Sequence, residues 1–242
     1  MDAFLMGADL RPGHGVKIVF EDNHVLVAYK PAGILSQADS SSDPDMLTIL
    51  KDFIKVRDNK PGNVWLGLLH RLDRPVSGIM VFAKTSKCAS RISEQIRQRK
   101  VVKRYRAVVF GTLEGEGEFE DFILKDSATN TVKVFDREVQ GSKRARLKYR
   151  AAGSSIIEGN TVTLVEVELE TGRSHQIRAQ FANSGHPLLG DHRYGREDRV
   201  KDIALQSFMI GFFHPVSGEY LEYTAPFPEG TPWDVFDKTK IE

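Results

Sequence analysis

Residues 101–110 read Val101-Val-Lys-Arg-Tyr-Arg-Ala-Val-Val-Phe110, and mostly apolar side chains occupy every second position. A period of two predicts a β-strand whose side chains alternate between two faces. Tyr105 falls on the more apolar face and is predicted to point inward, whereas Arg104 and Arg106 share the opposite face. Because an apolar face has to be covered by a core, this strand is expected to belong to a sheet.

The segments on both sides of this strand predict further strands and a few helices. Strands are expected at Val16–Phe20, His24–Tyr29, Leu66–Leu69 and Gly78–Ala83, and near 119–124, 131–136, 144–151, 161–169, 203–213 and 219–224. Helices are expected at Met46–Val56, Ser86–Arg97 and Ser174–Asn183. Asp43 and Ser86 are the predicted N-caps, and Gly185 the C-cap. No linker divides the chain, so one mixed domain with a large sheet is predicted.

The composition excludes several classes of protein. The chain has 242 residues, of which 40% are hydrophobic and 28% charged. Its single cysteine, Cys88, allows neither an internal disulfide nor a multi-cysteine metal site. No apolar run is long enough for a membrane span, and residues 1–15 lack the features of a secretory signal, so a cytoplasmic protein is expected. Nucleotide-binding glycine motifs and paired metal-binding histidines are absent, so neither a cofactor nor a metal is expected.

The net charge of +1 hides a strong segregation of charge along the chain. Residues 84–106 carry nine basic side chains against one acid, and residues 143–150 carry five basic side chains and no acid. Residues 107–126 reverse the balance, with six acids against one lysine. Basic segments of this kind are typical of a face that binds a polyanion such as RNA. The alternative is an ordinary solvated surface balanced by acids elsewhere.

Two short motifs contain candidate catalytic residues. In His70–Gly78, Asp73 lies between two arginines, which favours an ionised carboxylate that suits a nucleophile. The alternative for Asp73 is a structural ion pair in a loop. In Thr171–Arg178, Arg178 lies beside the apolar stripe of a predicted helix, where it would reach a buried anion, and Asp73 is a candidate. The alternative for Arg178 is a surface arginine with a buried stem.

Taken together, these segments resemble the RluA-type pseudouridine synthase family. The resemblance runs in order from about residue 16 to 228. It is carried by Asp22–Gly33, His70–Gly78, Lys103–Gly111, Thr171–Arg178, Gly185–Asp191 with Tyr194-Gly195, and His214–Gly218. It implies an α+β fold with a large mixed, mainly antiparallel sheet, flanking helices and loops, and a central active-site cleft. It also implies a single catalytic domain over residues 1–242, without the S4-type RNA-binding module of some relatives.

The implied activity is the isomerisation of a uridine within an RNA chain to pseudouridine, without metal or cofactor. By match to the motifs, Asp73 would be the catalytic aspartate on a flipped-out uridine, acting as a nucleophile or as a base. Tyr105 would stack on the uracil, and Arg178 would pair with Asp73. The implied substrate-binding residues are Arg71, which would enter the RNA, and Lys103, Arg173 and His175.

Two departures from the family pattern stand next to Asp73. Val76 replaces the usual threonine, so a hydroxyl contact is lost, and Pro75 replaces a more frequent acid. Arg74-Pro75 resembles members that modify tRNA, so the expected partner is tRNA or, as the alternative, ribosomal RNA. A monomer is expected. Two rival functions stay open: a non-catalytic RNA-binding or ribosome-assembly protein on the same fold, and a nucleosidase or glycosidase, which would normally need paired carboxylates.

Overall fold

The computed structural model describes residues 12–237 of the chain. Most of the N-terminal segment used to predict the absence of an export signal lies outside these residues. The chain divides into two compact units. The first comprises the residues up to Val102 together with Met209–Ala225, and the second comprises Lys103–Phe208 together with the residues from Pro226 onward. The single catalytic domain predicted for residues 1–242 stays a prediction.

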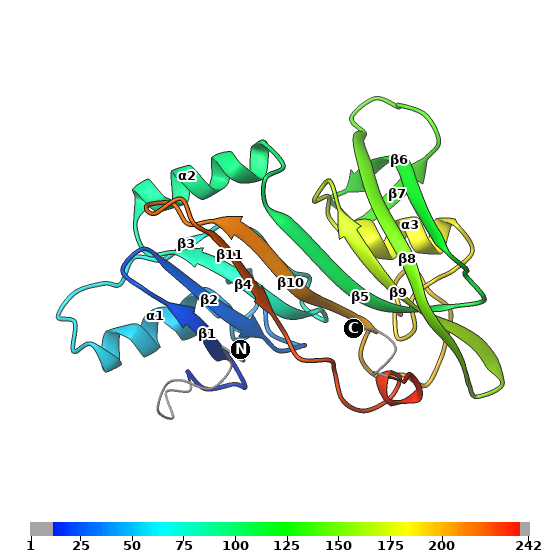
Figure 1. The fold of residues 1–242 in the computed structure, drawn as a ribbon, viewed down its shortest axis with the longest axis horizontal. Helices are drawn as coiled ribbons and strands as arrows, with labels where there is room; N and C mark the ends of the chain where they lie inside the picture. The colour runs from blue at the N-terminus through cyan, green and yellow to red at the C-terminus, as the bar shows by residue number, and fades with distance from the viewer. Residues whose placement is uncertain (1–11, 238–242) are drawn as a thin grey trace. The chain divides into compact units, whose positions relative to one another are not determined.

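The first unit is built around antiparallel strands (Figure 1). The strands β1 (Lys17–Glu21), β2 (Val25–Lys30) and β4 (Ser77–Ala83) pair in that order, with Val27 opposite Val81. The short strand β3 (Gly67–Leu68) also pairs with β4. A hairpin joins the second half of β10 (Leu205–Phe213) to β11 (Tyr220–Thr224). The strands predicted at Val16–Phe20 and His24–Tyr29 are therefore confirmed, and they pair with each other as a hairpin.

Both helices of the first unit occur as predicted, but each begins from a different cap. These helices are α1 (Met46–Arg57) and α2 (Ser86–Arg97). The N-cap of α1 is Asp45, whose carboxylate accepts from the Thr48 N–H at 3.2 Å, and not Asp43. The N-cap of α2 is Thr85, and not Ser86. Asp45 and Thr85 have extended backbones, which aim their side-chain oxygens at the N–H groups of the first turn.

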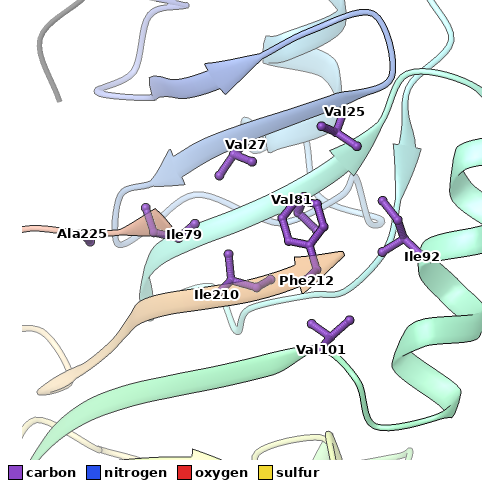
Figure 2. Packing of buried hydrophobic residues seen from close by; sticks show 9 residues of the cluster. All are labelled: Val25, Val27, Ile79, Val81, Ile92, Val101, Ile210, Phe212 and Ala225. Atoms are coloured by element: carbon purple, nitrogen blue, oxygen red, sulfur yellow. The ribbon is translucent and has the colours of Figure 1, made fainter. Parts of the chain in front are cut away.

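The core of the first unit collects the apolar side chains that strand alternation places on one face (Figure 2). Figure 2 shows Phe212 of β10 among side chains from β2 and β4, with Ile92 of α2 on one side. Each of these side chains is at most 1% exposed. The members are Val25, Val27, Ile79, Val81, Ile92, Val101, Ile210, Phe212 and Ala225. This cluster holds α2 against the strands.

The second unit contains five antiparallel strands in the order β5-β9-β8-β6-β7. Their bounds are β5 (Val102–Phe110), β6 (Glu116–Asp126), β7 (Thr131–Phe135), β8 (Lys143–Ile157) and β9 (Asn160–Leu169). The helix α3 (Gln176–Asn183) contacts β6 and β7, and a short 3-10 helix, η1 (Trp233–Val235), contacts β8. The mainly antiparallel sheet with few helices that the sequence predicted is confirmed.

The helix α3 begins two residues later than predicted. His175 has a left-handed backbone, with φ of 52°, so the helix cannot include Ser174 and starts at Gln176. At the other end, the C-cap is Ser184 and not the predicted Gly185, which follows it with a left-handed φ of 85°. None of the helices described between residues 12 and 237 is long and apolar enough to cross a bilayer.

The burial of two neighbouring phenylalanines in β10 predicts effects of different size on stability. Phe212 is completely buried, whereas Phe213, on the other face of β10, is 42% exposed. Phe212→Ala should lower the free energy of unfolding by about 3 to 5 kcal/mol, because it leaves a cavity in the core. Phe213→Ala, the matched control, should lower it by about 1 kcal/mol or less. Urea unfolding measures both, and equal effects would contradict the assignment of faces.

Candidate active site

The segment that carries Asp73 is held by a buried lysine at the end of β2. Lys30 is 0% exposed, and its Nζ donates to the backbone carbonyls of Pro31 (3.1 Å), Ile34 (2.6 Å) and Arg74 (3.0 Å). An ammonium group has three donors, so each of them finds one acceptor. Burial lowers the pKa of Lys30 to about 7, with Arg74 adding to the shift and Asp73 opposing it. The residue after Asp73 is thereby tied to the loop that follows β2.

A serine in the same loop fixes the residue before Asp73. Ser36 Oγ donates to the Leu72 carbonyl at 2.7 Å and accepts from the Leu72 N–H at 3.0 Å. The Val76 N–H donates to the carbonyl of Asp73 itself at 3.0 Å, which closes a tight turn. The backbone is therefore fixed on both sides of Asp73, whose side chain stays partly exposed.

Two further residues of this segment, Val76 and Arg71, differ in their exposure. Val76, where the family usually has threonine, is only 2% exposed, so its side chain packs in the interior. Arg71 is exposed and makes no hydrogen bond or ion pair with another described residue. Its side chain is accordingly available to a ligand from solution.

Sequence reasoning missed both Lys30 and Ser36. No sequence pattern assigned either residue to the site. The one available signal was a lysine at the end of the apolar run of β2, where a charge is unusual. Their contacts with the Asp73 segment span 44 residues for Lys30 and 36 for Ser36, and local patterns do not reveal contacts at that separation.

The strand β5 places its side chains as the alternation predicted. Tyr105 is 6% exposed and therefore points inward. On the opposite face, Arg104 pairs with Glu168 at 3.1 Å and Arg106 with Glu166 at 3.5 Å, both on the neighbouring strand β9. Lys103 is on the same side of the strand as Tyr105 and is mostly buried.

Arg178 is buried in α3, so the predicted alternative of a surface arginine is wrong. It is 6% exposed and forms a bidentate ion pair with Asp191. Nε donates to Oδ2 and Nη2 donates to Oδ1, both at 2.8 Å. Burial raises the pKa of Asp191, but Arg178 and the N–H groups of Arg193 and Tyr194 outweigh it, so the pKa is lowered overall. Asp73 belongs to the other unit, and its pairing with Arg178 stays a prediction.

The remaining predicted substrate-binding residues lie in the loop before α3. His175 Nδ1 is 2.7 Å from the hydroxyl of Tyr194, whose ring also lies 5.3 Å from the guanidinium of Arg178. Arg173 is exposed, and its Nε donates to the Arg144 carbonyl at 2.9 Å. The second unit thus brings His175 and Arg178 together around Tyr194, a residue that no sequence pattern had assigned to the site.

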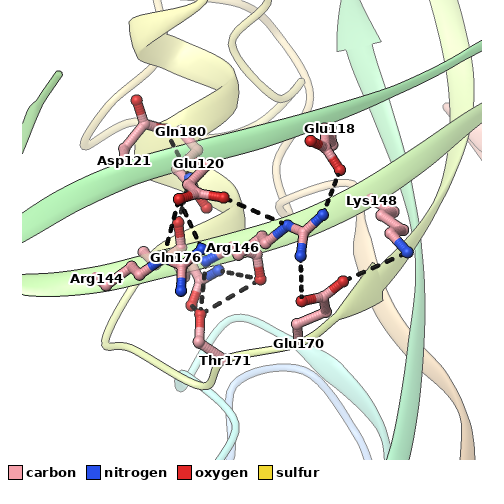
Figure 3. Close-up of polar contacts among 11 residues, drawn as sticks. Glu118, Glu120, Asp121, Arg144, Arg146, Lys148, Glu170, Thr171, Gln176 and Gln180 are labelled. Carbon is pink, nitrogen blue, oxygen red and sulfur yellow. Dashed lines mark hydrogen bonds and ion pairs between the residues drawn. The ribbon is translucent and has the colours of Figure 1, made fainter.

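The second basic segment is not an open basic face. Figure 3 shows Arg146 of β8 between acids of β6 and Glu170, with Arg144 and Lys148 paired beside it. The shortest of these contacts are Arg144 to Glu120 at 2.7 Å and Arg146 to Glu118 at 2.8 Å. The alternative interpretation, a solvated surface balanced by acids, is therefore the correct one for residues 143–150.

The first basic segment is divided between paired and unpaired side chains. Five of its members bind protein groups: Lys84, Arg91, Arg97, Arg104 and Arg106. The side chains of the other four make no hydrogen bond or ion pair with a described residue: Lys87, Arg99, Lys100 and Lys103. Within residues 12–237, no cluster of three histidine, cysteine or acidic side chains is arranged to hold a metal ion.

Comparison with known proteins identifies the family. The family model described as RNA pseudouridylate synthase matches residues 24–183. Ribosomal large subunit pseudouridine synthase D of Zymomonas mobilis is 32% identical over 248 residues, covering 95% of this chain and 77% of the relative. The protein of the same name from Nitrosomonas europaea is 33% identical over 226 residues, covering 88% of this chain and 62% of its own length.

The solved structure of human RNA Pseudouridylate Synthase Domain Containing 1 shares the fold. Its TM-score is 0.69 at 24% identity, with 92% of this chain and 86% of that chain covered. The chain therefore belongs to the RluA-type family of RNA pseudouridine synthases. Enzymes of this family are isomerases, so the predicted enzyme class and fold are confirmed.

The contacts of Lys30 predict a large loss of stability when its charge is removed. Lys30→Met should lower the free energy of unfolding by about 2 to 4 kcal/mol, because buried carbonyl groups lose their donor. Amide exchange at Gly33, whose N–H donates to the Arg74 carbonyl at 2.9 Å, should accelerate. Lys17→Met, an exposed lysine on β1, is the control and should change stability by about 0.5 kcal/mol or less. Unchanged stability in Lys30→Met would contradict this role.

The lowered pKa of Asp191 predicts a pH-dependent contribution to stability. Its folded pKa lies below the ordinary value of 3.8, so the contribution is complete above that value and is lost as the pH falls through the folded pKa. Asp191→Asn should therefore lower the free energy of unfolding by about 3 kcal/mol at pH 7, and by less near pH 3. Urea unfolding at both values measures this. Glu94→Gln, an exposed partner of Arg97, is the control and should have little effect at either pH.

Proposed function

We propose that this protein isomerises a uridine within a structured RNA to pseudouridine, with Asp73 as the catalytic aspartate. The observation that carries the proposal is the fixed segment around Asp73. Leu72 and Arg74 are held by Ser36 and Lys30, while the carboxylate between them remains partly exposed. A reacting group needs this combination of a fixed position and access to the substrate. Family membership supplies the reaction.

In the proposed reaction, the bond from N1 of the uracil to C1′ of the ribose breaks and a bond from C5 to C1′ forms. N1 gains a proton and C5 loses one, so the product has the same atoms as the substrate. Asp73 acts either as a nucleophile or as the base at C2′, and both routes need its ionised carboxylate. Tyr105 stacks on the uracil, and Arg178, oriented by Asp191, pairs with Asp73.

The proposed substrate-binding residues have separate tasks. Arg71, which is exposed, enters the RNA and helps to keep the uridine out of the stack. Lys103, Arg173 and His175 contact the substrate from the second unit. The whole chain is proposed to act as one catalytic domain and as a monomer, located in the cytoplasm.

Ribosomal RNA is the proposed substrate class. The curated relatives described above are named for the ribosomal large subunit. The motif Arg74-Pro75 had favoured tRNA, and these names outweigh it. The alternative function, a non-catalytic RNA-binding protein, would not need a catalytic carboxylate. Formation of pseudouridine therefore distinguishes the two functions, whereas RNA binding does not.

The test compares the wild-type protein with Asp73→Asn on transcripts of large-subunit ribosomal RNA and on tRNA. Wild type should form pseudouridine at one or a few positions in the ribosomal transcript, read out by chemical mapping. Asp73→Asn should lose activity by on the order of a thousandfold or more, while its RNA affinity stays within about threefold of wild type.

Asp39→Asn is the control for the loss of a negative charge in the first unit. Asp39 is exposed and accepts only a local hydrogen bond from the Ser41 N–H, so activity should be unchanged. Substantial product from Asp73→Asn would remove Asp73 from the mechanism. Product in tRNA alone would overturn the ribosomal assignment.

A further inference from the structure

The charges of β5 differ sharply between the two faces of the strand. On one face, Arg104 and Arg106 each pair with a glutamate of β9. On the other, Lys103 is on the side of Tyr105 and makes no hydrogen bond or ion pair with any described residue. The cation that lacks a described partner is thus the one on the same face of the strand as the tyrosine proposed to contact the substrate.

Burial makes this lack of a partner costly. The side chain of Lys103 is mostly withdrawn from solvent, and burial lowers the pKa of its ammonium group. A cation removed from water without a compensating anion or acceptor destabilises the folded protein. An anion that binds against the ammonium group would recover part of that free energy. The structure thus favours a ligand with negative charge at this position.

The ammonium group lies beside a position that has no side chain. A Cβ built on Gly172 would meet Lys103 Nζ at 3.3 Å, which is tighter than an ordinary contact. Gly172 is itself exposed, so the space next to the ammonium group is open to a ligand from solution. The backbone of Gly172 is outside the positive-φ region, so no turn geometry demands glycine there. The presence of glycine at position 172 is explained instead by the space that the ammonium group and its ligand need.

We propose that Lys103 Nζ and the space over Gly172 bind a phosphate group of the RNA backbone, at or next to the target nucleotide. This rests on the proposed function. A phosphate carries a full negative charge, which offsets the burial of an ammonium better than the partial charge of a base carbonyl. Two residues along a strand span about 7 Å, so a base on Tyr105 and its own phosphate on Lys103 fit this spacing.

The first test measures RNA affinity against salt concentration for the wild type, Lys103→Met and Lys103→Arg on the RNA that the wild type modifies. Lys103→Met should bind about tenfold more weakly and should reduce the slope of log affinity against log salt by about one phosphate contact. Lys103→Arg should keep both, because arginine also binds phosphate and cannot transfer a proton at neutral pH. Arg104→Gln is the matched control on the paired face and should leave the slope unchanged.

The second test neutralises single phosphates of the RNA as methylphosphonates around the target uridine. Neutralisation of one particular linkage should weaken RNA binding by the wild type and should not weaken binding by Lys103→Met any further. The single variant Gly172→Ala, which keeps Lys103, should also weaken binding and lower the salt slope, and this keeps the test valid if Lys103→Met folds poorly. In the Lys103→Met background, Gly172→Ala should have no further effect. An equal loss of affinity on phosphate neutralisation in the wild type and in Lys103→Met would overturn the phosphate site. An unchanged salt slope in Lys103→Met would also overturn it.

Pseudouridine mapping on the same RNA separates this proposal from the proposed function. If the wild type binds RNA with the expected salt slope but forms no pseudouridine, the proposed function is contradicted and the phosphate site is not. Normal modification by the wild type together with an unchanged slope in Lys103→Met removes only the phosphate site. Full binding but no product in Lys103→Arg would also contradict the proposal, because it would indicate proton transfer by Lys103.

Discussion

The geometry of the first unit depends on the three hydrogen bonds from the Lys30 ammonium group to backbone carbonyls. A buried cation is tolerable when each of its donors has an acceptor, and here the acceptors come from the loop after β2 and from the residue after Asp73. The contact therefore joins segments 44 residues apart in the sequence. Ser36 makes a parallel connection to Leu72, so the aspartate sits on a segment braced from both sides.

A second constraint, strand alternation, explains why the charges of this chain are segregated in sequence. Acidic β6 and basic β8 pair antiparallel, with Glu118 opposite Lys148 and Glu120 opposite Arg146. Segments of opposite charge thereby lie side by side and neutralise each other locally, as Figure 3 shows for Arg144, Arg146 and Lys148. An RNA-binding surface has to be sought among the cations that this pairing leaves over, and not in the basic runs as a whole.

The periodicity of apolar residues was sufficient to predict the strands, the helices and the inward direction of Tyr105, because these depend on neighbours in sequence. The cap of α1 was misplaced by two residues, since Asp43 and Asp45 are equally good oxygen acceptors and only the backbone of Asp45 aims one at the helix. Lys30, Ser36 and Asp191 could not be predicted, because their roles come from contacts with distant segments. Buried Arg178 required an anion, but the chain contains many aspartates, and local pattern does not choose among them.

Lys30, which is fully buried, and Lys103, which is partly buried, show why burial alone does not distinguish a structural cation from a ligand-binding one. Burial lowers the pKa of both. Lys30 is satisfied by carbonyl groups, and no ligand is required to account for it. Lys103 has an exposed glycine beside it and no partner among the described residues. The neighbouring strand β9 supplies glutamate partners to Arg104 and Arg106 on the other face of β5. The absence of such a partner at Lys103 is therefore a property of its own face, and it is accounted for by an anion that arrives with the substrate.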